Sequence, residues 1–385
     1  MRVDKAPKSH LETSYQFFDR IAGDYWQQVR DLMQTWLDRV EIDRDYRDLR
    51  GRLAADDAAH YSAFLELYLH ELFCRAGYTV HIHPSVAGSP RRPDFLIEGH
   101  GESFYVEATM PGPQRAAQGR SQRRSAFLDT LQSCRNRNFF LSLDRLIVGP
   151  EPAKGAAARR VIDAWLNTLD PDQVHYDGPN RESFVWERDG WEAEFSAIPI
   201  SKEHRGRPDH RALGVYADGD VEWIDNAPSM QSALRSKANA YGDTGHPLIV
   251  ALGTYIWDRD RWHATNALYG RAGVTWWENG KGEVHTTEVR QPDGYFGIPP
   301  DWANASVAAV LHVNQLQPHH LHSAEVTLWP HPTQQDRLDG LANRIPATTV
   351  TADDSRLAAT NAPVDPFKYF DLPDPWPAGE AFPVD

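Results

Sequence analysis

Three acidic residues in the first third of the chain could together form a metal site. Asp94 follows Pro93 at the start of a short apolar run, Glu107 closes the next apolar run, and Glu66 lies upstream in an amphipathic segment. Divalent cations such as Mg²⁺ take carboxylate oxygens as ligands. Two carboxylates held close together without a cation would repel, which would raise the pKa of one of them. These residue types therefore favour a site that binds a divalent ion.

The segment that carries Glu66 has the pattern of an amphipathic helix. Its apolar residues recur at helical spacing, and Gly77 stands where a helix C-cap in the left-handed conformation is expected. We therefore predict a helix over 60–76. Glu71 lies on the same helix, so either it or Glu66 could be the inward-facing acid.

The other two acids belong to a predicted hairpin. Residues 79–83 alternate with the period of a strand, while 95–97 and 103–107 are short apolar runs separated by a glycine-containing turn. If the two runs pair in an antiparallel manner, Asp94 at the start of one and Glu107 at the end of the other lie at the same end of the hairpin.

At these positions the chain resembles the restriction-endonuclease-like nucleases of the PD-(D/E)XK superfamily. Pro93-Asp94 matches the first part of their motif, and Glu107-Ala108-Thr109 matches the second part with its last position altered. Glu66 matches an acidic residue that many members carry on the first helix. The resemblance implies an α/β fold, with a mixed β-sheet flanked by helices and a core in the order helix, three strands, second helix, fourth strand.

The resemblance also implies a set of metal ligands. Asp94, Glu107 and the carbonyl of Ala108 would hold Mg²⁺, for which Mn²⁺ could substitute. Glu66 would hold an outer-shell water of that ion or a second ion. The activity implied is that of an Mg²⁺-dependent, endonuclease-type phosphodiesterase.

The motif departs from the family at Thr109, where a lysine is usual. That lysine orients the attacking water and stabilises negative charge in the transition state, and threonine cannot do so as a cation. The chain has seven lysines, and Lys237 is the best candidate for a substitute. It lies in 228–241, a predicted helix that precedes a buried strand at 247–252. Gln231 on the same helix is a further candidate.

Each of these residues also has a simpler explanation. Asp94 after a proline could be a turn residue, and Glu107 could form a cross-strand ion pair with an arginine. Lys237 could be a solvated helix residue. The position of its ammonium group separates these interpretations, because only an ammonium within hydrogen-bond reach of Asp94 or Glu107 supports an enzyme.

Nucleic acid is the expected partner, although the formal net charge is −14. Phosphate binding requires clustered cations, and such a cluster follows the Glu107 strand directly. Arginine forks suit phosphate oxygens, so this cluster could contact a nucleic-acid backbone beside the metal site. A solvated helix face is the alternative. The arginines proposed for this role are Arg115, Arg120, Arg123 and Arg124.

Length and composition indicate a globular protein. The chain has 385 residues, of which 41% are hydrophobic and 24% charged, enough for two to three domains. Its polar start and the lack of any long apolar run predict a soluble, cytoplasmic protein with no membrane segment. Two cysteines provide neither a disulfide framework nor zinc spacing.

We expect an N-terminal helical segment (1–58, with helices over 11–50 that end in the charged stretch 43–52), a first part of the core (59–113), an inserted α/β region (114–224), a second part of the core (225–255), a C-terminal sheet extension (256–346) and an extended tail (347–385).

Tryptophans are frequent after residue 254. Trp257, Trp262, Trp276 and Trp277 could stack on bases, although buried core is the commoner use of tryptophan. We expect these four residues to lie in the core.

The function expected is a metal-dependent nuclease, with DNA favoured and a role in genome defence or repair. The insertion could read the substrate or form a homodimer. The main alternative, supported by Thr109 and the acidic net charge, is a catalytically degenerate fold that binds nucleic acid or protein. A hydrolase or binding protein for small phosphorylated ligands is a second alternative.

Overall fold

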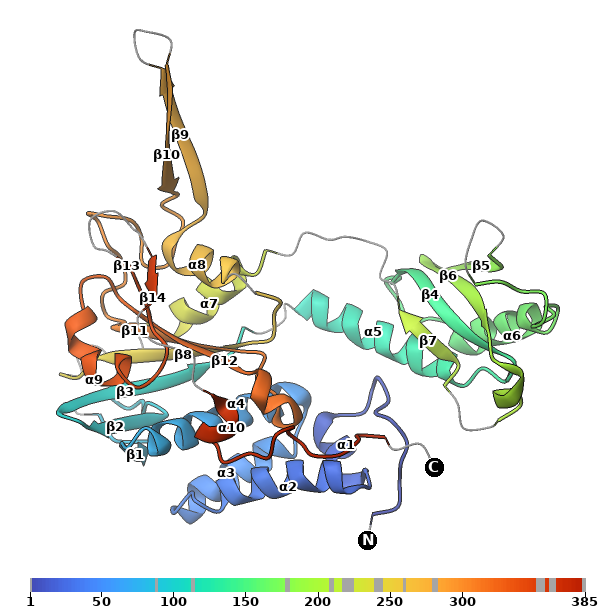
Figure 1. Ribbon diagram of the computed structural model, residues 1–385, viewed down its shortest axis with the longest axis horizontal. Coiled ribbons are helices and arrows are strands. Elements are labelled where there is room, and N and C mark those ends of the chain that lie inside the picture. Colours follow the sequence, from blue (N-terminus) through green and yellow to red (C-terminus); the bar gives the residue numbers. More distant parts are fainter. Residues whose placement is uncertain are drawn as a thin grey trace. The chain divides into compact units, whose positions relative to one another are not determined.

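The computed structural model divides the chain into two compact units (Figure 1). Unit 1 comprises 1–7, 13–112 and 225–385, and unit 2 comprises 8–12 and 113–224. The chain therefore contributes a short segment, 8–12, and one long segment, 113–224, to unit 2, and returns to unit 1 after each. The structure describes residues 2–86, 89–111, 115–176, 181–207, 211–216, 225–238, 245–258, 261–278, 283–350, 357–359 and 365–382.

A mixed six-stranded sheet forms the centre of unit 1. Its strands run in the order β1-β2-β3-β8-β11-β12. The pairs β1/β2, β2/β3 and β11/β12 are antiparallel, whereas β3/β8 and β8/β11 are parallel. The structure thus confirms a mixed α/β protein. The strands are β1 (Thr79–Ile82), β2 (Phe95–Gly99), β3 (Glu102–Thr109), β8 (Leu248–Thr254), β11 (Ala309–Asn314) and β12 (Glu325–Pro330).

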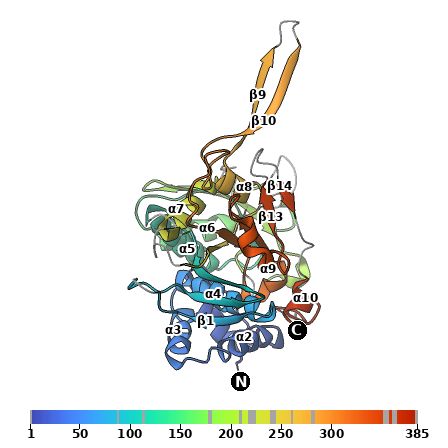
Figure 2. The ribbon, with the colours of Figure 1, turned by 90° about the vertical axis from the view of Figure 1, so that its left-hand side faces the viewer.

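Helices cover both faces of this sheet, and Figures 1 and 2 show α4 and α7 on opposite sides of it. Successive strand residues point to opposite faces, so Ile249 and Ala251 pack with α4 while Val250 packs with α7 and α8. Burial on both faces explains why β8 consists almost entirely of apolar residues. The helices are α1 (Ser14–Arg20), α2 (Asp24–Leu37), α3 (Asp43–Leu53) and α4 (Asp57–Arg75) on one side, and α7 (Ala227–Ala238) and α8 (Trp262–Tyr269) on the other.

The helix and the hairpin predicted around the three acids are both present. Helix α4 begins after Asp56, whose side chain accepts a hydrogen bond from the Ala59 amide, and Gly77 follows its end with φ +85°. Strands β2 and β3 pair with Phe95 opposite Val106. The hairpin is longer than expected, because its strands extend to a tight turn at 100–101.

The charged stretch 43–52 is itself a helix, α3. It is one of three helices in the N-terminal segment, where the sequence indicated helical structure over 11–50. Acidic residues in its first turn and Arg50 and Arg52 in its last turn complement the helix dipole. Leu49 and Leu53 pack into the core next to α4. Its polar face therefore has a defined position beside Glu66.

Unit 2 has a four-stranded sheet of its own, in the order β5-β6-β4-β7. Its core contains Phe127, Phe139 and Phe195. The elements are α5 (Arg115–Gln132), β4 (Phe139–Ile147), α6 (Gly155–Leu166), β5 (Ser183–Arg188), β6 (Trp191–Pro199), a short helix η1 (Lys202–His204) and β7 (Leu213–Tyr216). Both helices and strands are therefore present in the region where an inserted α/β structure was expected.

The four tryptophans expected in the core are exposed. Trp276 and Trp277 lie on β9 (Ala272–Glu278), which pairs with β10 (Val284–Arg290) in a two-stranded sheet. Their relative exposures are 71% and 53%, and Trp257 is 75% exposed. Trp262 is 39% exposed. The expectation was wrong because tryptophan content alone does not distinguish a core strand from an isolated hairpin.

The region 347–385 is not an extended tail where the structure describes it. Phe370 and Trp376 are buried in the same core as α4, and the indole of Trp376 donates a hydrogen bond to the Pro318 carbonyl at 3.0 Å. Proline-rich composition concealed these two aromatic anchors. The remaining C-terminal elements are η2 (Pro318–Ser323), η3 (Gln335–Leu338), α9 (Asp339–Ala342), β13 (Thr348–Val350), β14 (Leu357–Ala359) and α10 (Pro366–Tyr369).

Within the described residues, no helix combines the length and the apolar character that crossing a membrane would require.

Candidate metal centre

Asp94 and Glu107 occupy neighbouring positions on adjacent strands. Phe95 pairs with Val106 in the antiparallel register, so the two acids are the next opposed residues. The Asp94 carboxylate accepts a hydrogen bond from the Ala108 amide at 2.7 Å. This bond holds the Asp94 side chain across the strand that carries Glu107. Ala108, predicted to offer its carbonyl to an ion, thus contributes its N–H group to the position of Asp94.

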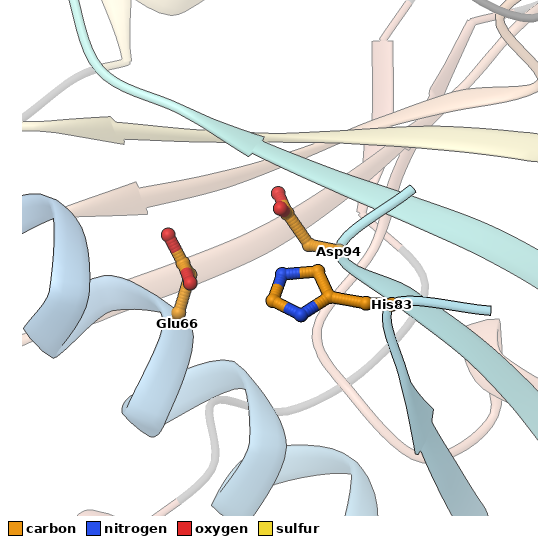
Figure 3. Close-up of side chains that lie close together, drawn as sticks. All are labelled: Glu66, His83 and Asp94. Atoms are coloured by element: carbon orange, nitrogen blue, oxygen red, sulfur yellow. The ribbon is translucent and has the colours of Figure 1, made fainter. Parts of the chain in front are cut away.

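Glu66 is the third acid of the cluster. Figure 3 shows its carboxylate facing Asp94 from helix α4. Glu71, the alternative on the same helix, is fully buried and pairs instead with Arg39 and Arg75. Five residues along a helix correspond to a rotation of about 140°, which explains why the two acids face different partners.

Arg52 fixes the orientation of Glu66. Both guanidinium nitrogens Nη1 and Nη2 lie 2.6 Å from the two carboxylate oxygens of Glu66. Such a bidentate pair has a defined geometry and partly compensates the cost of burying Glu66, which is 7% exposed. A carboxylate has about four lone-pair positions, so two bonds to Arg52 leave room for a cation. The sequence did not indicate Arg52, because nothing in it links α3 to α4.

The pKa of Asp94 is raised from its ordinary value of 3.8 to about 8. Burial is the largest cause, followed by the negative charges of Glu107 and Glu66. The Ala108 amide and the charge of Lys237 act in the opposite direction. The cluster therefore contains more acid than its own cations compensate, and a bound divalent ion would relieve that excess.

Lys237 reaches Glu107 from helix α7. Its ammonium nitrogen lies 2.5 Å from Oε1 of Glu107. Glu107 is 6% exposed, so this ion pair is shielded from solvent on the carboxylate side. The ammonium of Lys237 is thus within hydrogen-bond reach of Glu107, which is the distance that supports an enzyme.

Thr109 and Gln231 have different surroundings. Thr109 ends β3 and is half-buried, two residues after Glu107 and therefore on the same side of the strand. Gln231 donates hydrogen bonds to the carbonyls of Ala267 and Asp293, at 3.1 and 2.6 Å. Six residues separate Gln231 from Lys237, about 240° around the helix, so the two side chains point in different directions. Gln231 holds α7 against α8.

His83 is a member of the cluster that sequence reasoning missed. Single ligand atoms of Glu66, His83 and Asp94 all lie within 4.8 Å of one another. His83 follows β1, and its backbone amide donates to the Asp94 carbonyl at 2.9 Å. The only hint in the sequence was its position at the end of the alternating run 79–83, directly before the acidic motif.

The four arginines proposed to contact phosphate lie on α5 of unit 2. Arg123 donates through Nε to the Gly149 carbonyl at 3.0 Å, so it takes part in the packing of that unit. Arg120 is exposed, and Arg124 is half-buried. Arg115 lies in the first turn of the helix.

Unit 1 also contains a small pocket. It has a volume of about 170 Å³ and lies where β3 and β8 end, beside helix α4. The lining is mainly apolar and includes Tyr61, Leu65, Met110, Gly253 and Tyr255.

Comparison of the chain with protein-family models, with curated proteins and with solved structures gave no match. The functional interpretation therefore depends on the geometry of the cluster.

Proposed function

We propose that this protein is a metal-dependent phosphodiesterase with a PD-(D/E)XK-like core, acting on nucleic acid and preferentially on DNA. The observation that carries the proposal is the convergence of Glu66, Asp94 and Glu107 with the ammonium of Lys237. Acids that can hold a metal ion, with a lysine beside them, suit hydrolysis of a phosphodiester. In that reaction the metal ion and the ammonium group stabilise negative charge on the phosphate.

The order of the elements supports the same proposal. Helix α4 is followed by β1, β2 and β3, and after unit 2 by helix α7 and strand β8, which pairs with β3 in a parallel manner. This is the order that the resemblance implies. In this proposal unit 2 is an insertion between the third strand and the second helix of the core.

The residues present fit a divalent ion. Asp94 and Glu107 offer carboxylate oxygens. Burial, together with the negative charges of Glu107 and Glu66, raises the pKa of Asp94, so a bound cation would stabilise its ionised form. Glu66 would hold an outer-shell water of the ion or contribute directly. When bound, Mg²⁺ or Mn²⁺ would supply Lewis-acid stabilisation of the phosphate and a more acidic water.

Lys237 takes the part of the missing motif lysine in this proposal. A lysine at Thr109 would project on the same side of β3 as Glu107, and Lys237 brings an ammonium to Glu107 from α7 instead. There it can donate a hydrogen bond to an incoming water or to the phosphate oxygens. The arginines of α5 are proposed to contact the nucleic-acid backbone.

The altered motif position favours one second candidate, a protein that binds nucleic acid or protein without cleaving it. The two candidates make different predictions for hydrolysis. We would incubate the full chain with linear, circular and single-stranded DNA and with RNA, in Mg²⁺, Mn²⁺ or chelator. Metal-dependent cleavage that is lost in both Asp94→Ala and Glu107→Ala supports the proposal.

Glu98→Gln is the matched control, because Glu98 lies on the same hairpin but pairs with His81 at the surface. This variant should cleave like the parent. Cleavage that survives in Asp94→Ala and Glu107→Ala would refute the site. Tight binding of nucleic acid without cleavage under any of these conditions would support the binding protein.

A further inference from the structure

His83 has three features of a metal ligand. The first is its position, since one of its ring nitrogens is among the three ligand atoms that lie within 4.8 Å of one another. Figure 3 shows the imidazole beside the two carboxylates, with one ring nitrogen turned toward them. The three side chains come from a helix, from the end of a strand and from the start of the next strand.

The second feature is a buried carboxylate behind the imidazole. Nδ1 of His83 lies 3.2 Å from Oδ1 of Asp45, whose side chain is 2% exposed. A carboxylate at Nδ1 favours the tautomer with the proton on Nδ1, which leaves the lone pair of Nε2 free for a ligand. Metal-binding histidines commonly donate their other N–H group to a carboxylate in this way. Arg44 in turn pairs with Asp45 at 2.9 Å.

The third feature is the backbone of His83, which has φ +46°. This left-handed conformation is uncommon for residues other than glycine. Residues that adopt it are often found at active sites and ligand-binding sites. The hydrogen bond from the His83 amide to the Asp94 carbonyl maintains it. The imidazole is thus held at the cluster by its backbone as well as by Asp45.

We propose that His83 is a direct ligand, so that Glu66, His83 and Asp94 together hold a first-row transition-metal ion such as Mn²⁺ in preference to Mg²⁺. This inference rests on the proposed function for the presence of a metal ion, but it does not depend on which bond is hydrolysed. Mg²⁺ prefers an all-oxygen octahedral shell, whereas imidazole nitrogen suits transition metals. A nitrogen ligand at this position therefore shifts selectivity away from Mg²⁺.

The arrangement also separates the roles of the acids. Glu107 is paired with Lys237 and Glu66 with Arg52, so each has a cation of its own. His83 adds a ligand without adding a negative charge. The site can thus bind a doubly charged ion without a fourth carboxylate.

The test uses the full chain freed of metal by chelation and dialysis. Affinities for Mn²⁺ and Mg²⁺ are measured by calorimetry, and bound Mn²⁺ is examined by pulsed electron paramagnetic resonance. The wild-type protein should bind Mn²⁺ at least about tenfold more tightly than Mg²⁺. The bound ion should show coupling to a nitrogen nucleus.

His83→Asn is the informative variant, because asparagine tolerates the left-handed backbone conformation of this position. The backbone N–H group that donates to the Asp94 carbonyl is also retained. It should lose about 10- to 100-fold in Mn²⁺ affinity and the nitrogen coupling, while Mg²⁺ affinity changes by less than about threefold. His81→Asn is the matched control two residues earlier, on β1, since His81 pairs with Glu98 at the surface. It should behave like the wild type.

Asp45→Asn tests the buried carboxylate and should weaken Mn²⁺ binding by about tenfold or more while the nitrogen coupling remains. Wild-type Mn²⁺ without nitrogen coupling would overturn the inference even if no variant folded. An unchanged ratio of Mn²⁺ to Mg²⁺ affinity in His83→Asn would also overturn it.

The outcomes separate this inference from the proposed function. Nitrogen-coupled Mn²⁺ in a protein that cleaves no nucleic acid would refute the nuclease and retain the ligand. Metal-dependent cleavage that His83→Asn leaves unchanged, with no nitrogen coupling, would retain the nuclease and refute the ligand.

Discussion

The ammonium of Lys237 lies 2.5 Å from Oε1 of Glu107, although 130 positions separate the two residues in the sequence. Residues 113–224, which form most of unit 2, lie between them along the chain. The ion pair joins the third strand of the central sheet to the helix that precedes β8. A cation therefore lies beside Glu107, the acid of the altered motif Glu107-Ala108-Thr109, which lacks the usual lysine at its last position.

Replacement of Lys237 by methionine should reduce cleavage by about 10²- to 10³-fold, because a donor to developing negative charge is removed. Metal affinity should not fall, since the carboxylates remain and removal of the ammonium leaves Glu107 without its paired cation. Steady-state cleavage rates and calorimetry measure the two effects. Arg235→Met on the exposed side of the same helix is the control and should cleave normally.

Introducing a lysine at position 109 tests the same idea from the opposite direction. In the Lys237→Met background, Thr109→Lys should restore part of the activity, because its side chain lies on the same side of β3 as Glu107. The rate of the double variant relative to Lys237→Met is the measurement. No gain in the double variant, together with full activity of Lys237→Met, would exclude a catalytic ammonium at Glu107.

The raised pKa of Asp94 predicts a specific pH dependence of stability. In the metal-free folded protein Asp94 holds its proton up to about pH 8, whereas in the unfolded chain it releases the proton near its ordinary value of 3.8. Between these values the folded state binds more protons, so the free energy of unfolding falls as pH rises. The fall is at most about 1.4 kcal/mol per pH unit.

Asp94→Asn should remove this contribution. Urea unfolding in chelator from pH 5 to pH 8 should show the variant gaining stability relative to the wild type as pH rises. Parallel curves for the two proteins would mean that Asp94 is already ionised in the folded state at pH 5.

Metal uptake should release the proton held by Asp94. The association constant for the divalent ion is expected to rise by about tenfold per pH unit below pH 8 and to level off above it. Calorimetry in two buffers of different ionisation enthalpy measures the number of protons released. A value near zero at pH 7 would contradict the raised pKa.

Removal of Arg52 should destabilise the metal-free protein. Arg52→Ala leaves the buried carboxylate of Glu66 without its bidentate partner, at an expected cost of about 3–5 kcal/mol. A divalent ion should restore part of the loss, so the stabilisation by MnCl₂ should be larger in this variant. Urea unfolding with and without metal tests both statements. Arg47→Ala, which breaks an exposed pair with Asp43 on the same helix, should change stability by less than about 1 kcal/mol.

Local patterns in the sequence were sufficient to predict α4 and the β2/β3 hairpin. Helical spacing with a glycine cap and two apolar runs around a short turn are signals within a few residues of each other. The position of Glu66 near Asp94 depends on how that helix packs on that hairpin, and it was anticipated from the resemblance to the nuclease superfamily. These parts of the site could therefore be anticipated.

Arg52 and His83 could not be predicted in the same way. Arg52 lies in a highly charged segment, and its bond to Glu66 depends on the packing of α3 against α4. His83 reaches the cluster because its backbone turns into the left-handed region directly after β1. Both effects are tertiary, and no spacing rule records them. Trp376 was missed for a related reason, since its partners lie in a segment far away in the sequence.

Translation order gives the Lys237 pair one more consequence. A ribosome produces Glu66, Asp94 and Glu107 long before it reaches Lys237, and residues 113–224 of unit 2 must be synthesised in the interval. A nascent chain that stops within unit 2 thus carries the acids without the ammonium. The centre becomes complete only when the chain has returned to unit 1 and α7 has been synthesised. An unfinished polypeptide therefore does not carry the full set of proposed catalytic groups.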